Sequence, residues 1–137
     1  MPLVFLDANV LIAAARVVGP LGRAALAVLD DPSNRFAASD FLRLEALPKA
    51  AHAKRVAEAA FYRRFFGQAA VWAIAEPQLV SRALSLAERF GLSAMDALHV
   101  AAAISTGSDA LITGEKPGKP IYRVTGLRVW PLLEAPV

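Results

Sequence analysis

Short apolar segments of strand length alternate along this chain with longer segments of helical periodicity. The strand-like segments are residues 3–6 (LVFL), 35–38 (RFAA), 70–75 (AVWAIA), 110–113 (ALIT), 121–124 (IYRV) and 128–132 (RVWPL). Few two-residue hairpin signals join them, and helical stretches separate most of them. Strands connected in this way lie parallel in a sheet whose faces helices cover. The pattern therefore predicts an α/β fold with a mostly parallel central sheet flanked by helices.

Apolar periodicity and capping residues predict the helices. They span residues 10–16, 22–30, 41–47, 52–66, 78–90 and 94–105. The expected N-caps are Asn9, Ser39 and Ser93, the Gly19-Pro20 pair breaks the first helix, and Pro48 is expected to kink or restart the third. There is no internal repeat, low-complexity tract or linker, so residues 1–137 are predicted to form one domain.

Composition limits the kind of protein that this chain can be. With 137 residues, 56% of them hydrophobic, it can build one buried core. No stretch reaches the roughly 18 apolar residues of a membrane-spanning helix. The N-terminus has no basic leader and carries Asp7 within its apolar run, so a signal peptide is not expected. We expect a cytoplasmic protein without a membrane partner.

The absence of cysteine narrows the possible chemistry further. Without cysteine, disulfides, thiolate catalysis, iron–sulfur clusters and thiolate zinc sites are excluded. The histidines, His52 and His99, are far apart and form no HExxH motif, and a satisfied, partly buried role is expected for His99. Any metal should therefore be held mainly by oxygen ligands.

Four acidic residues stand at positions where a solvated acid is not the default. Asp7 ends the first strand and Glu115 follows the strand that ends at Thr113, while Glu45 and Asp96 lie in largely apolar helical segments. Ligands bind beyond the carboxyl ends of parallel strands. Each acid also has an ordinary explanation: Asp7 as a helix cap, Asp96 as a capping-box partner of Ser93, and Glu45 and Glu115 as surface acids.

Together these segments resemble the motifs of a known family. FLDANVLI at residues 5–12 is similar to the first motif of PIN domains, SDFLRLEALPKA at 39–50 to the second, and LSAMDALHVAAAISTGSDALIT at 92–113 to the third. The fourth motif departs from the family, because Glu115 in TGEKPGKPIYRV stands where Asp is usual. The resemblance spans nearly the whole chain and implies a single PIN-like domain, with a length that suits the VapC-type toxins of toxin–antitoxin pairs.

The resemblance implies a metal-dependent endoribonuclease that uses Mg²⁺ or Mn²⁺, hard cations that prefer oxygen ligands. In this interpretation Asp7 and Asp96 are the principal metal ligands, Glu45 positions metal or water, and Glu115 completes the site. Asn9 and Thr113 would orient these carboxylates. The implied partners are an RNA substrate, a cognate antitoxin protein and a second copy of the chain in a homodimer.

Charge is consistent with an anionic partner. The chain has 15 lysine and arginine residues against 12 acidic ones, and the four site acids leave a larger basic excess on the rest of the surface. The candidates for contact with the RNA backbone are Lys54, Arg55, Arg63, Arg64, Lys116 and Lys119. The alternative is that these side chains form an ordinary solvated surface.

Two other functions remain open from the sequence. A phosphotransferase of the haloacid dehalogenase kind also begins with a strand ending in Asp, but it needs a second Asp at the position of Asn9. A PIN-like domain with an altered fourth motif could instead be an RNA-binding or protein-interaction domain, and Glu115 is the residue that favours this interpretation. Metal binding would separate this last interpretation from the ribonuclease.

Overall fold

The first apolar run forms the middle strand of a five-stranded sheet. In the computed structural model, which describes residues 1–136, the strand order is β3-β2-β1-β4-β5 and every strand pair is parallel. All four residues of the central strand are buried, as expected for a continuous apolar run in a parallel sheet. The strands are β1 (Leu3–Leu6), β2 (Arg35–Ala38), β3 (Val71–Trp72), β4 (Ala110–Thr113) and β5 (Arg128–Pro131). The predicted α/β class is confirmed.

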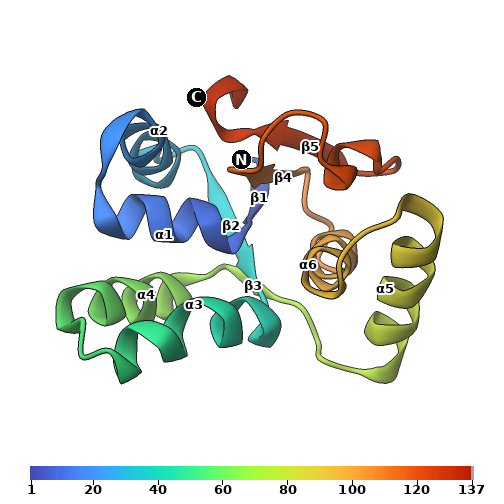
Figure 1. Ribbon diagram of the computed structural model, residues 1–137, viewed down its shortest axis with the longest axis horizontal. Coiled ribbons are helices and arrows are strands. Elements are labelled where there is room, and N and C mark those ends of the chain that lie inside the picture. Colours follow the sequence, from blue (N-terminus) through green and yellow to red (C-terminus); the bar gives the residue numbers. More distant parts are fainter. Residues whose placement is uncertain (137) are drawn as a thin grey trace.

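Six α-helices surround this sheet within the described residues. They are α1 (Ala8–Arg16), α2 (Gly19–Asp30), α3 (Asp40–His52), α4 (Val56–Gln68), α5 (Pro77–Phe90) and α6 (Ala94–Ser105). Consecutive helices pack in pairs, α1 with α2, α3 with α4 and α5 with α6, and Figure 1 shows the three pairs arranged around the sheet. Helix α6 packs directly on β1, β2 and β4, so its alanine-rich sequence fits a close helix–sheet contact.

The beginnings of the first two helices differ from the prediction. Asp7, not Asn9, is the N-cap of α1, because its side chain accepts a hydrogen bond from the backbone N–H of Ala8. Helix α2 begins at Gly19 rather than at residue 22, since Pro20 has no N–H to lose and is tolerated in a first turn.

Three other predicted segments also have different structures. The helix expected over 52–66 begins only at Val56, because Lys54 takes a left-handed φ of 57° between α3 and α4. His52 is the last residue of α3. Helix α3 continues through Pro48 to His52. Residues 121–124 lie not in a strand but largely in a short 3-10 helix, η1 (Pro120–Arg123), where Ile121 is buried, so tertiary packing overrides the strand preference of this segment. A second 3-10 helix, η2 (Leu132–Glu134), follows β5.

The core lies on both faces of the sheet. Its largest fully buried side chains include Phe5, Leu11, Leu42, Tyr62 and Leu111. Trp72 and Trp130, expected in the core or an interface, are half-buried at the edge strands. Of the helices that the structure describes, none alone is long and apolar enough to cross a membrane; α1 and α2 meet that test only as a pair bent by 105°.

Candidate metal and nucleic-acid site

Asp7 lies at the carboxyl edge of the sheet, where β1 and β4 end side by side. Leu6 is opposite Ile112, and the Asp7 backbone N–H donates to the Ile112 carbonyl at 2.9 Å. Asp7 as a whole residue is only 4% exposed. One oxygen accepts from the Ala8 backbone N–H and the other from the Thr113 hydroxyl, each at 2.8 Å. Asp7 is therefore both the cap of α1 and a fixed carboxylate at the edge of the sheet.

A hydrogen bond to Asn9 holds the loop after β4 against α1, and two further bonds fix the loop itself. The Gly114 N–H donates to Asn9 Oδ1 at 2.8 Å, and a Cβ at position 114 would lie only 3.2 Å from that oxygen. The Glu115 N–H donates to the Thr113 hydroxyl at 3.2 Å, and the Tyr122 hydroxyl donates to the Glu115 carbonyl. Asn9 thus positions the loop backbone that carries Glu115, while Thr113 contacts a site carboxylate directly.

Helices α3 and α6 bring Glu45 and His99 together, although 54 residues separate them in sequence. His99 Nε2 lies 3.1 Å from Glu45 Oε1 and 3.9 Å from Asp7 Oδ1. The ring is fully buried beside Phe5, and its Nδ1 has no hydrogen-bond partner within residues 1–136. A hydrogen on Nδ1 would therefore be unpaired, so we assign the hydrogen to Nε2, which donates to Glu45. This contact holds the pKa of Glu45 below its usual value.

Asp96 lies in the first turn of α6. The Ser93 hydroxyl accepts from the Asp96 backbone N–H at 3.3 Å, which is the serine half of a capping box. Burial raises the pKa of the Asp96 carboxyl group, and the negative charges of Asp7 and Glu115 raise it further. The ionised carboxylates of Asp7 and Glu115 therefore both disfavour ionisation of Asp96, as expected for a cluster of like charges.

The four predicted site acids all line one cavity of about 370 Å³. They come from four different parts of the chain: the end of β1, α3, α6 and the loop after β4. Asp7, Glu45 and His99 have potential ligand atoms within 4.8 Å of one another. Because His99 Nε2 carries the hydrogen that it donates to Glu45, the ligands that this group offers a metal are its two carboxylates. Carboxylate oxygens are the donors that Mg²⁺ and Mn²⁺ prefer, and a cation would offset the repulsion of Asp96 by Asp7 and Glu115. The donor set therefore fits a divalent metal ion.

The predicted RNA-contact residues lie elsewhere on the surface. Lys54, Arg55 and Arg63 line a small hollow of about 120 Å³ beside α4. Arg64 lines a groove between α2 and α4, Lys116 borders a cavity near η2, and Lys119 is exposed. Within residues 1–136, none of these six cations lines the acidic cavity; its basic residues are instead Arg16 and Lys49.

Arg16 was not predicted from the sequence to be a site residue. The contact of His99 with a site acid was not predicted either. A helical spacing signal was available for Arg16, because Asn9, Ile12 and Arg16 follow at intervals of three and four residues and all three line the cavity. Lys49 likewise stands one turn after Glu45 on α3. No local signal indicates the contact of His99 with Glu45, which depends on how α3 packs against α6.

Comparison with known proteins places this geometry in context. The PIN domain family model matches residues 4–117. No curated protein matches the chain at a significant level.

Solved structures with this fold are distantly related in sequence. VapBC2 from Rickettsia felis bound to a promoter DNA fragment is 16% identical, with a TM-score of 0.68 over 94% of this chain and 98% of that one. A toxin–antitoxin complex from Klebsiella pneumoniae is 20% identical, with a TM-score of 0.64 over 96% and 99%. VapC20 from Mycobacterium tuberculosis, a toxin that cleaves the sarcin–ricin loop, is 16% identical, with a TM-score of 0.65 over 91% and 98%. At such identities the likeness is one of fold.

Proposed function

Because this chain belongs to the PIN domain family, we propose that it is a metal-dependent endoribonuclease that hydrolyses RNA phosphodiester bonds. The observation that carries the proposal is the convergence of Asp7, Glu45, Asp96 and Glu115 on one cavity at the carboxyl edge of the sheet. Membership of this family decides against the haloacid dehalogenase alternative. In addition, the amide oxygen of Asn9 accepts a hydrogen bond from the Gly114 backbone N–H. An amide cannot act as the acid and base that a haloacid dehalogenase-type enzyme needs.

In the proposed site, Asp7, Asp96, Glu45 and Glu115 hold Mg²⁺ or Mn²⁺. Such an ion supplies an activated water nucleophile and stabilises charge on the oxygens of the phosphodiester. The surrounding residues keep the carboxylates in place: Thr113 and the Ala8 N–H fix Asp7, and His99 fixes Glu45. Carboxylates that are already oriented lose less freedom when the metal and the substrate bind.

Glu115 is the residue on which the scaffold alternative depends. Its backbone N–H donates to the Thr113 hydroxyl and its carbonyl accepts from the Tyr122 hydroxyl, and the residue lines the same cavity as the other acids. The longer side chain can therefore reach the site from a rigid backbone. We infer that it serves in place of the usual aspartate.

The proposal is tested by incubating the isolated chain with one structured and one single-stranded RNA, in Mg²⁺ or Mn²⁺ and in chelator. We expect metal-dependent cleavage that Asp7→Asn abolishes. Asp30→Asn removes the same charge at an exposed position on α2 and should leave cleavage unchanged. Cleavage that persists in chelator would contradict the metal mechanism. Folded protein that binds no metal and cleaves neither RNA would favour the RNA-binding or protein-interaction alternative.

We further propose that the chain is the toxin of a type II pair, inhibited in the cytoplasm by a cognate antitoxin and assembled as a homodimer. The similarity to toxin–antitoxin complexes supports the proposed antitoxin partner.

The proposed homodimer is supported by an exposed apolar face. Val80 and Leu84, one turn apart on α5, are 52% and 63% exposed, and a second copy of the chain would cover such a face. Light scattering should give twice the mass of the chain. The product of the adjacent reading frame should bind and block cleavage; a monomer that this product does not bind would contradict both proposals.

A further inference from the structure

Arg16 lines the acidic cavity and is held there by an ion pair that the proposed chemistry does not use. It stands in the last turn of α1, and its Nε donates to Glu58 Oε1 on α4 at 3.1 Å. The Arg16 side chain is 49% exposed, whereas that of Glu58 is only 12% exposed. The guanidinium group therefore faces solvent, and its partner is anchored inside the protein.

Glu58 is itself fixed by a second hydrogen bond. Its other oxygen accepts from the hydroxyl of Tyr62, a fully buried side chain, at 2.9 Å. Burial acts to raise the pKa of Glu58, but the hydrogen bonds from Arg16 and Tyr62 outweigh it and leave the pKa below its usual value. Glu58 is thus a charged, immobile acceptor that sets the orientation of Arg16.

This arrangement leaves the terminal amino groups of Arg16 for another acceptor, because the bond to Glu58 uses Nε. A guanidinium group presents its donors in a planar fork that matches a phosphate, and fixing one edge lowers the cost of binding with the other. An exposed ion pair by itself contributes little to stability. Fold stability is therefore a weak reason for a half-buried carboxylate and a buried tyrosine to hold one surface arginine.

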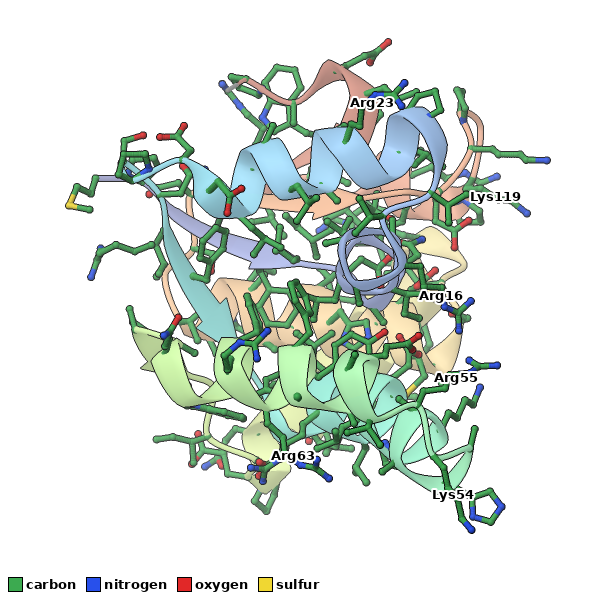
Figure 2. All side chains as sticks on the ribbon, turned by 90° about the vertical axis from the view of Figure 1, so that its left-hand side faces the viewer. Arg16, Arg23, Lys54, Arg55, Arg63 and Lys119 are labelled. Carbon is green, nitrogen blue, oxygen red and sulfur yellow. The ribbon has the colours of Figure 1, made fainter. Side chains whose placement is uncertain are left out.

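The surrounding charges favour a polyanion at this place. Figure 2 shows Arg16 at the same edge of the molecule as Arg55 and Lys119, and between them in this view. The charge of Arg55 also lowers the pKa of Glu58, so both arginines act on the same carboxylate. An RNA strand bound along this edge would pass the cavity, where the site acids would repel its phosphates. A fixed cation at the cavity offsets that repulsion.

We propose that Arg16, oriented by Glu58 and Tyr62, binds an RNA phosphate next to the scissile one. This inference rests on the proposed ribonuclease function. It assigns Arg16 a role in binding the substrate and assigns Glu58 and Tyr62 the role of positioning Arg16.

The test measures binding of a fluorescent single-stranded RNA by anisotropy over a range of salt concentrations, with Asp7→Asn in every protein to prevent cleavage. Loss of one phosphate contact should reduce the slope of log Kd against log salt by about 0.7. Arg16→Gln should show this change and bind about fivefold more weakly at about 0.1 M salt. Arg16→Lys should recover the slope. Arg82→Gln, which removes an exposed arginine from α5, should match the parent.

A positioning role for Glu58 has a different signature. Glu58→Gln keeps the charge of Arg16 and should keep the salt slope, but in the otherwise native chain it should raise KM for RNA. A lower melting temperature of Arg16→Gln with an unchanged slope would show that the ion pair is only structural and would overturn the inference. An equal change in Arg82→Gln would overturn it as well, because the slope would then report net charge.

The role of Arg16 and the ribonuclease function can be refuted separately. If the native chain cleaves RNA and Arg16→Gln keeps the parent slope, only the inference about Arg16 is wrong. If the Asp7→Asn parent binds no RNA and the native chain cleaves none in any metal, the proposed function and the inference both fall.

Discussion

Replacing Thr113 by valine removes one donor from a buried carboxylate with almost no change of shape. Thr113 is fully buried, and its hydroxyl donates to Asp7 Oδ2 at 2.8 Å. A hydrogen bond to a charged group contributes about 1.5–3 kcal/mol, and the oxygen left without a donor cannot reach bulk water. We therefore expect Thr113→Val to lower the free energy of unfolding by about 2 kcal/mol. For a domain of this size the melting temperature should fall by about 8 °C.

The measurement is thermal unfolding followed by circular dichroism in chelator, with Thr125→Val as the control. Thr125 is exposed, so the same change there should stay within about 0.5 kcal/mol of the parent. The valine at position 113 should also weaken metal binding, because Asp7 loses the donor that orients it. If Thr113→Val melts together with the Thr125 control, the hydroxyl does not fix Asp7, and the reasoning about an oriented carboxylate is wrong.

Three further substitutions test other contacts of the site. Asp96→Asn should raise the melting temperature of the metal-free protein and abolish stabilisation by metal. Because the native pKa of Asp96 is raised, the parent gains stability from this group as the pH falls from neutral through that pKa, and the variant should lack this gain. His99→Leu should lower kcat about 10–100-fold by releasing Glu45, with a smaller change in KM for RNA and partial recovery in His99→Gln. Gly114→Ala should cost about 1 kcal/mol in thermal unfolding, because the new Cβ crowds Asn9.

Each of these has an outcome that contradicts it. A lower metal-free melting temperature of Asp96→Asn with an intact metal response would mean that the residue acts only as a helix cap. Equal loss of kcat in His99→Leu and His99→Gln would show that the ring has a role other than donation to Glu45. A Gly114→Ala protein as stable as the parent would mean that the loop backbone does not depend on its approach to Asn9.

The sheet was predictable because its central strands are continuous apolar runs. Residues 3–6, 35–38 and 110–113 are strands in the structure with the predicted bounds, since a strand buried on both faces leaves a simple pattern. The carboxyl ends of parallel strands lie at one edge of a sheet, so Asp7 and Glu115 could also be predicted to lie at the same edge. In contrast, residues 121–124 have strand-forming side chains, but the burial of Ile121 and the bond from Tyr122 to Glu115 place most of the segment in a 3-10 helix.

The candidate site was predictable in its acids and less so in what surrounds them. The four acids reach one cavity, while their catalytic roles stay predictions. The His99–Glu45 contact joins α6 to α3 across 54 residues, and no local pattern encodes such a distance. The six proposed RNA-contact cations were chosen by clustering in sequence, whereas the cations of the cavity, Arg16 and Lys49, stand apart on two helices.

The most direct test of the central claim is the anomalous difference map of a crystal of the native chain grown with Mn²⁺. We predict a peak in the cavity between the carboxylates of Asp7, Glu45 and Asp96, absent from a crystal of Asp96→Asn grown in the same way. Manganese peaks only at other places on the protein, or none at all, would contradict the claim that these acids hold the metal.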